Sequence, residues 1–283
     1  MTAVLDRIDT RPHANWRYVK GLGRVSAGAI LFSLPLLMTM EMWWLGFYLE
    51  RPHLLQFLIV NFLVLVGLAR VSGFEKTSGW GEDIMDAFAV YSIAAVWSFA
   101  ILWLLGVIGT GQSVDEIVGK VALQCVPASF GAMLASKQLG SSEGGGADSE
   151  RARASYVGQL FLMLAGALFL GFNLAPTEEI ILISFQMSPV QAIMLVVISI
   201  MLLHAIVYTV GFKGQEKPVG PTSFWSIFMR FTITGYAIAA ATALYLLWTF
   251  GRVEGTAVTQ IIGMVAVLAF PGAIGAAFAR LVV

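Results

Sequence analysis

"GAILFSLPLLMTMEMWWLGF" at residues 28–47 and "GALFLGFNLAPTEEIILISF" at residues 166–185 are two versions of one apolar segment, 138 positions apart. Each is long enough to cross a bilayer, which takes about 20 predominantly apolar residues. Their shared positions are the pairs Gly28–Gly166, Thr39–Thr177, Glu41–Glu179 and Phe47–Phe185. Because an acid recurs at one position of both segments, the pattern predicts a duplicated membrane fold.

The repeat extends through the rest of both halves. "YSIAAVWSFAILWLLG" (91–106) matches "YAIAAATALYLLWTFG" (236–251) at an offset of 145, and "VPASFGAMLA" (126–135) matches "FPGAIGAAFA" (270–279). Four spans therefore align with four spans. Since four is even, both copies enter the membrane in the same direction, which predicts parallel repeats related by an axis along the membrane normal. Transporter sites often lie where such repeats meet.

The apolar segments predict an all-α integral membrane protein with eight transmembrane helices. The expected spans are 24–48, 53–72, 84–108, 115–136, 155–185, 189–211, 224–250 and 256–280. The polar, glycine-rich "SSEGGGADSERARA" is typical of a flexible linker. The predicted domains are a cytoplasmic arm (1–23), repeat 1 (24–136), a cytoplasmic linker (137–154) and repeat 2 (155–283).

The composition agrees with a membrane protein. Of the residues, 58% are hydrophobic and 12% are charged, whereas a soluble domain carries about 25% charged residues. The net charge of +0 gives no basic surface for nucleic acid. The single Cys125 excludes a disulfide framework, and no two of the three histidines have metal-ligand spacing. We expect no cofactor.

The distribution of positive charge predicts the orientation. The N-terminus is polar and lacks the short apolar core of a cleavable signal peptide. With that end inside, fourteen of the 17 Lys and Arg residues lie on the inner side, and Arg51, Arg252 and Lys120 on the outer side. Cytoplasmic loops carry such an excess. We expect a multi-pass protein of the bacterial inner membrane with both termini in the cytoplasm.

Glu41 and Glu179 are the principal candidates for a functional site. A charged side chain at the bilayer centre costs about 2.5–3.5 kcal/mol on insertion scales, and such residues usually face the bundle interior or a wet cavity. Two symmetry-related carboxylates, with Thr39 and Thr177 beside them, predict a cation or proton site. The alternative is that both acids lie near the outer headgroups as helix-dipole partners. Glu178 is a weaker candidate because its counterpart is Met40.

Prolines predict breaks in the helices that carry these acids. Pro176 lies in the middle of a 31-residue apolar segment, and Pro35 precedes Glu41 by six residues. Proline removes a backbone donor and clashes with the preceding turn, so a break just before Pro176 is expected. Asn173 is a candidate cap for the second half-helix and a candidate ligand. Broken helices line sites in many transporters.

Four further polar residues within or beside the spans are possible gate or relay residues. Asn61 and His204 lie at mid-membrane positions, where a helix–helix hydrogen bond is the commoner role; a histidine can also switch its charge with pH. Asp86 and Arg230 open matching spans, which suggests an ion pair across the two halves or solvated helix ends. Gln124 has no polar counterpart, and no role is assigned to it.

The duplicated acidic helix, "PLLMTME" and "APTEEI", resembles a family of bacterial integral membrane proteins known as a domain of unknown function, over nearly all of the chain. "RVSAGAILFSLPLLMTMEMW" is more loosely similar to the first helix of the lysosomal potassium and proton channel family. That family has a Phe-Ser-Asp signature and six spans per repeat, whereas this chain has "FSL" and four.

These observations favour an ion channel or transporter for a cation or proton, with its site between the repeats. No P-loop, HExxH or GxSxG motif occurs, so we expect no enzymatic activity; an intramembrane enzyme using the carboxylates is a third possibility. The expected partners are the lipid bilayer and an inorganic cation or proton, and a homo-oligomer is compatible with this interpretation. The alternative is a non-transporting scaffold or lipid-binding protein that uses the basic arm.

Overall fold

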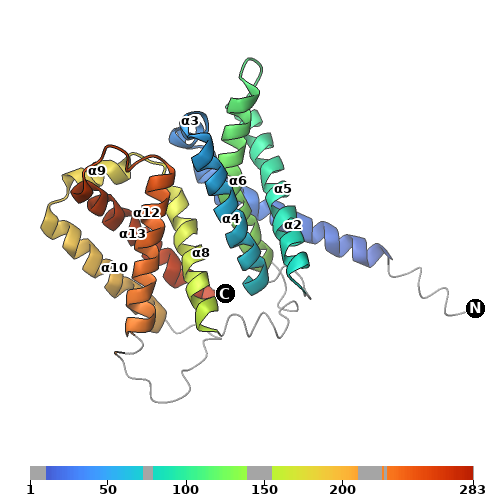
Figure 1. The fold of residues 1–283 in the computed structure, drawn as a ribbon. Coiled ribbons are helices and arrows are strands. Elements are labelled where there is room, and N and C mark those ends of the chain that lie inside the picture. Colours follow the sequence, from blue (N-terminus) through green and yellow to red (C-terminus); the bar gives the residue numbers. More distant parts are fainter. Residues whose placement is uncertain (1–10, 73–78, 139–154, 210–224, 226–227, 283) are drawn as a thin grey trace, which may run out of the picture.

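The computed structural model describes residues 11–72, 79–138, 155–209, 225 and 228–282, and these residues form helices joined by short turns (Figure 1). The first group of helices is α2 (Arg11–Leu37), α3 (Met40–Tyr48), α4 (Arg51–Ser72), α5 (Trp80–Leu104) and α6 (Val114–Gln138). The second group is α8 (Tyr156–Leu174), α9 (Glu179–Gln186), α10 (Pro189–Thr209), the π-helix η1 (Phe228–Ile233), α12 (Thr234–Thr249) and α13 (Val258–Val282). Residues 1–10 of the predicted arm and 139–154 of the predicted linker lie outside the described residues.

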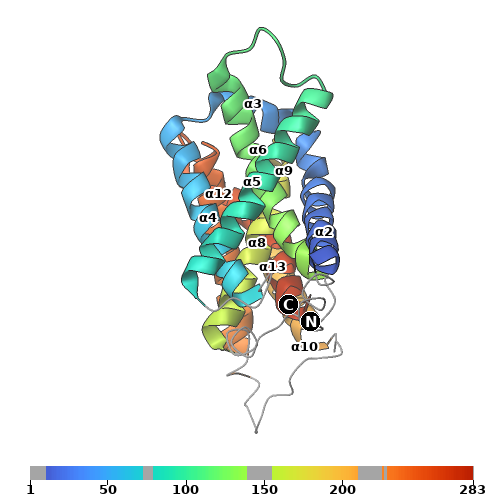
Figure 2. The same ribbon diagram turned by 90° about the vertical axis from the view of Figure 1, so that its right-hand side faces the viewer.

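The described helices supply seven candidate membrane spans, or eight if α2 and α3 together count as one. This agrees with an all-helical, multi-pass protein. The expected first and fifth spans, 24–48 and 155–185, are not continuous helices. Each is divided into one long helix and one short helix, α2 with α3 and α8 with α9. The two short helices lie at the same end of the bundle (Figure 1). Figure 2 shows α3 at one end of the bundle and the C-terminus, which follows α13, toward the other end.

The helices of each group pack around a close crossing of two glycine-containing helices. In the first group, a Cβ atom added to Gly131 of α6 would lie 2.6 Å from the carbonyl oxygen of Gly28 in α2. In the second, a Cβ atom on Gly275 of α13 would overlap the carbonyl oxygen of Gly166 in α8. Small residues let helix backbones approach closely, which replaces the hydrophobic driving force that lipid does not provide.

Aromatic rings join the two groups of helices. Phe57 of α4 packs edge-on against Phe172 of α8, with ring centroids 5.6 Å apart, and against Phe250, at 5.4 Å. Phe130 of α6 contacts the same Phe172 at 5.2 Å. Further ring pairs are Phe32–Phe169 and His53–Trp248. Several side-chain hydrogen bonds and ion pairs connect elements within one group, such as Arg51–Asp115 in the first and Arg252–Pro176 in the second.

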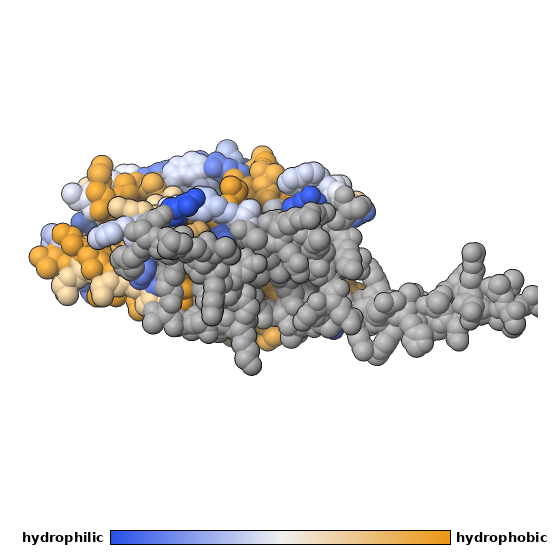
Figure 3. Space-filling view, turned by 90° about the horizontal axis from the view of Figure 1, so that it is seen from below, coloured by the Kyte–Doolittle hydropathy of each residue, from blue (hydrophilic) through white to orange (hydrophobic). Residues whose placement is uncertain are grey.

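The outer surface of the bundle is apolar. α5 and α10 are the candidate spans with the smallest buried share, and large hydrophobic side chains such as Phe88, Ile193 and Met201 are more than 60% exposed. Figure 3 shows the molecule from below, the side on which α13 ends. Apolar residues gather at its left edge, which is the side of α9 and α10 in Figure 1. Such a surface suits contact with lipid, because lipid chains impose no cost on exposed apolar side chains.

Candidate functional site

The first predicted acid, Glu41, lies just after a sharp break between two helices. α2 continues to Leu37 with Pro35 inside it, and the axis of α3 is bent by 86° from that of α2. The turn forms at Thr39, which has an extended backbone (φ −92°, ψ 118°). The Thr39 hydroxyl donates a hydrogen bond to the carbonyl oxygen of Pro35, 2.6 Å away. Glu41 is half-buried in the first turn of α3.

Two side chains donate hydrogen bonds to carbonyl groups at the end of α2, where the break occurs. Nε2 of Gln124, a fully buried residue of α6, donates to the carbonyl oxygen of Leu36 at 2.8 Å. The indole Nε1 of Trp43 donates to Leu37 at 2.7 Å. A helix end normally leaves four carbonyl groups unpaired. Gln124 therefore stabilises this break. The sequence did not indicate this role, because Gln124 has no polar counterpart in the second half.

A second break separates α8 from α9. α8 ends at Leu174, two residues before Pro176, and Pro176 is in the turn. The Thr177 hydroxyl donates to the carbonyl oxygen of Leu174 at 2.9 Å. Nη2 of Arg252, from the turn before α13, donates to the carbonyl oxygen of Pro176 at 2.6 Å. Both threonines that were predicted beside the acids thus bind helix-end carbonyl groups.

The acids of the second break are exposed. Glu178 is the residue before α9 and makes no side-chain cap, and Glu179 is in the first turn. Both side chains are classed as exposed. Asn173 does not cap α9: its Nδ2 donates to the carbonyl oxygen of Phe169, one turn back in α8, at 2.8 Å. The break therefore forms without the cap that the sequence suggested.

The three glutamates lie in or just before the first turn of a short helix, α3 or α9. Carboxylates in the first helical turn are stabilised by the unpaired amide groups and by the helix dipole. Among the described residues, no group of three or more His, Cys, Asp or Glu side chains could hold a metal ion. This placement is compatible with the alternative that the acids are helix-dipole partners, and the cation or proton site stays a prediction.

A cluster of charged residues, which the sequence interpretation did not identify, packs on α3 from α6. Lys120 is 8% exposed, and its Nζ contacts Oε1 of Glu116 at 2.5 Å and the carbonyl oxygen of Val107 at 3.3 Å. Asp115, the residue before Glu116, forms an ion pair with Arg51 of α4. The i, i+4 spacing of Glu116 and Lys120 is the one sequence signal for this cluster. The Arg51–Asp115 pair has none.

Charged residues at the opposite end form pairs within each group of helices. Asp83 is fully buried, and its Oδ2 lies 3.3 Å from Nη1 of Arg70. Arg230 places its guanidinium group over the ring of Tyr156, with 5.2 Å between Cζ and the centroid. One Asp86 carboxylate oxygen is buried. The ion pair predicted between Asp86 and Arg230 is not among the contacts that the described residues show, and it stays a prediction.

Asn61 lies at the junction between the two groups of helices. It is fully buried, and its Nδ2 donates to the carbonyl oxygen of Phe57, one turn back in α4, at 2.6 Å. Phe57 is the residue whose ring contacts the second group. Ser199, at the matching position of α10, is also fully buried and donates to Leu195. Each side chain thus bonds within its own helix.

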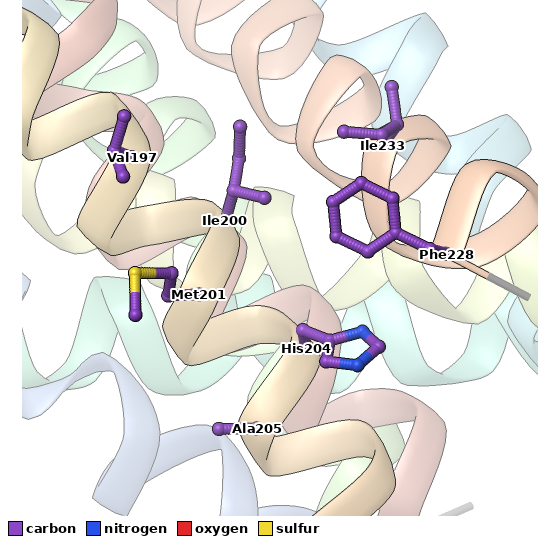
Figure 4. A pocket seen from close by; sticks show the side chains of 7 residues that line it. All are labelled: Val197, Ile200, Met201, His204, Ala205, Phe228 and Ile233. Atoms are coloured by element: carbon purple, nitrogen blue, oxygen red, sulfur yellow. The ribbon is translucent and has the colours of Figure 1, made fainter. Parts of the chain in front are cut away.

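His204 lines a groove between α10 and η1 (Figure 4). Its Nδ1 lies 2.8 Å from the hydroxyl oxygen of Thr232, a fully buried residue of η1. The other residues that line the groove are apolar: Val197, Ile200, Met201, Ala205, Phe228 and Ile233. The structure therefore gives His204 the interhelical hydrogen bond that is the commoner role of such a residue.

Comparison with known families identifies the class of protein. The model of a family described as "Putative integral membrane protein (DUF2391)" matches residues 21–283. Searches of the curated proteins and of the solved structures gave no match. The match confirms the resemblance to membrane proteins of unknown function. With nearly the whole chain covered, and with at least seven helices suited to span a bilayer, the chain belongs to this family of integral membrane proteins.

Proposed function

We propose that this protein moves a cation or proton across the bacterial inner membrane, as a channel or transporter built from two parallel four-helix repeats. The observation that carries the proposal is the recurrence of one local structure. In each half, a long helix ends and a threonine hydroxyl donates a hydrogen bond to one carbonyl group of its last turn. A short helix then begins, with Glu41 or Glu179 in its first turn.

The bounds of the helices support the duplication. α3 ends at Tyr48 and α9 at Gln186, and α4 begins at Arg51 and α10 at Pro189; both pairs are separated by 138 positions. α5 ends at Leu104 and α12 at Thr249, 145 positions later. The glycine after each of these ends, Gly106 and Gly251, has a positive φ of 71° and 70°. Chance similarity of apolar sequences would not reproduce helix ends and turn geometry together.

The glycine crossings support it further. In the register of the repeat, Gly28 and Gly131 correspond to Gly166 and Gly275, and each pair makes the close approach within its own half. The excess of Lys and Arg in the loops of the other side supports an orientation with the short helices outside and both termini in the cytoplasm. The glutamates would then form the outer entrance of the transport path, where negative charge raises the local concentration of cations.

The test is ion flux through purified protein in liposomes. Glu41→Gln and Glu179→Gln remove one charge each with little change in shape. Glu254→Gln is the matched control, because Glu254 is an exposed acid in the turn whose Arg252 binds Pro176 near α9. We expect the first two variants to reduce flux of the transported ion and Glu254→Gln to retain it.

The proposal fails if both glutamine variants carry the parent fluxes of Na⁺, K⁺, Ca²⁺ and H⁺. If the parent protein carries none of these ions, the alternative of a scaffold or lipid-binding protein is favoured. Deletion of residues 1–20 then tests that alternative, because a scaffold that uses the basic arm would lose its partners.

A further inference from the structure

The groove between α10 and η1 has the size and position of a binding site within the membrane. Its volume is about 400 Å³, inside the usual range for ligand pockets, about 300–1,000 Å³. Val197, Ile200 and Met201 form one wall, Phe228 and Ile233 form the other, and the ring of His204 extends from α10 toward the Phe228 side (Figure 4). The groove is thus lined by apolar side chains, with the polar side chain of His204 in its α10 wall.

The groove extends from the middle of α10 toward the C-terminal end of this helix. Val197 is near the middle of α10, and His204 is close to its last residue, Thr209. The two are separated by roughly 10 Å along the helix axis at 1.5 Å per residue. Trp225 is 67% exposed and packs on Phe228 with ring centroids 6.1 Å apart. Tryptophan is enriched at the membrane–water boundary, so the His204 end is the headgroup end.

The two halves differ at this place, in the register of the proposed duplication. Ile200 and Ile233 correspond to Phe62 and Phe88 of the first half. There the two phenylalanine rings pack edge-on, with centroids 6.4 Å apart, and Phe62 also contacts Tyr91 at 6.0 Å. Smaller side chains in the second half leave the space between the helices unfilled. The smaller side chains that leave this space open therefore occur in the second copy.

The polar lining residue His204 and its hydrogen-bond partner Thr232 are specific to the same copy. His204 and Thr232, which are hydrogen-bonded to each other, correspond to Val66 and Ala87. Thr232 belongs to the π-helix, and π-helical turns occur frequently at functional sites. Compared with the first copy, the second copy has more space here, a hydrogen-bonded polar pair and a π-helix. Three differences at one place are unlike a random packing defect.

The groove opens toward lipid. Val197 is 49% exposed and Met201 is 64% exposed, and both belong to the candidate span Pro189–Val207, which has the highest mean hydropathy of the seven, 2.6. Hydrocarbon chains are the molecules present at that surface and depth. We propose that the groove binds one acyl chain of a bilayer phospholipid, with the chain end near Val197 and the headgroup near Trp225.

The test uses a phospholipid that carries a photoactivatable diazirine on its acyl chain, in liposomes that contain the full chain. Mass spectrometry locates the labelled peptides. In the parent protein we expect labelling of α10 to concentrate between Val197 and Ala205. The double variant Ile200→Phe/Ile233→Phe, which restores the aromatic residues of the first half, should lose this labelling. Ile193→Phe is the control, because Ile193 is 65% exposed on the same helix outside the groove.

Even labelling along α10 in the parent protein overturns the proposal, and so does labelling that persists in the folded double variant. The parent pattern decides the matter even if the double variant does not fold. Crosslinks between two copies of the chain at these residues would mean that a second protein molecule occupies the groove. The proposal uses the duplication but not the transport activity, so the labelling of Glu41→Gln/Glu179→Gln should equal that of the parent whether or not ion flux is lost.

Discussion

Substitution of Gly275 by alanine provides a direct measure of how closely α13 and α8 pack. A Cβ atom at this position would overlap the Gly166 carbonyl oxygen and approach Cγ of Leu170 at 3.1 Å. The overlapped atom belongs to the backbone of another helix, so a side-chain rotation cannot relieve the clash. The two helices must separate, and we expect Gly275→Ala to destabilise the protein by about 1–3 kcal/mol, the usual cost of overpacking.

Gly272→Ala, one turn earlier on the same helix, is the control. Its Cβ atom would lie 3.5 Å from Cβ of Ala239, which is an ordinary contact. The difference in intrinsic helix propensity between glycine and alanine, about 1 kcal/mol in water, is the same for both variants and cancels in the comparison. We expect Gly272→Ala to be at least as stable as the parent.

The assay is reversible unfolding in mixed micelles, followed by the fluorescence of the 8 tryptophan residues. A loss of about 1.4 kcal/mol corresponds to a tenfold change in the unfolding equilibrium constant. Gly166→Ala should cause a similar loss, and the double variant should lose less than the sum, because one separation of the helices relieves both clashes. Equal stability of Gly275→Ala and Gly272→Ala would refute the proposed close crossing.

Three further predictions concern other parts of the molecule. Gln124→Leu removes the hydrogen bond to the end of α2 and should cost about 0.6–1 kcal/mol, as typical interhelical bonds in membranes do, which the same unfolding assay measures. Lys120→Met should destabilise the protein by leaving Glu116 without its partner, and adding Glu116→Gln should restore part of the loss; full stability of the single variant would contradict a structural ion pair. In a Cys125→Ser background, Thr110→Cys should react with an impermeant maleimide on intact cells and Glu82→Cys only after permeabilisation, and the reverse pattern would invert the proposed orientation.

The sequence predicted the class of the fold, because the length of each apolar segment depends on local composition alone. The breaks were harder to place. Pro35 lies inside α2, where the helix continues for two more residues, since neighbouring helices can satisfy the carbonyl group that a proline frees. The turn occurs at Thr39 instead, and "LLMTME" contains no glycine or asparagine to indicate it. Two expected long spans thus became four helices.

Whether the sequence could predict a polar contact depends on how far apart the two residues are along the chain. Glu116 and Lys120 are one helical turn apart, so their pairing follows from helical periodicity. Arg51 and Asp115 are 64 residues apart, and Pro176 and Arg252 are 76 apart. These contacts depend on how helices are arranged in space, for which one sequence contains no direct signal. The groove beside His204 was hidden for the same reason, because it is defined by two helices.

The aromatic junction between the two groups of helices has a mechanical consequence. Edge-to-face ring pairs are stabilised over a range of centroid separations, about 4.5–7 Å, whereas a hydrogen bond weakens steeply with misalignment. Phe57, Phe130 and Phe172 are at most 1% exposed and belong to one apolar core that includes residues of both groups, so their contacts resist separation of the groups. Because ring contacts tolerate a wider range of separations than hydrogen bonds do, we expect a change in bilayer thickness to alter the angle between the two groups before it disrupts the hydrogen-bonded helix breaks within each group.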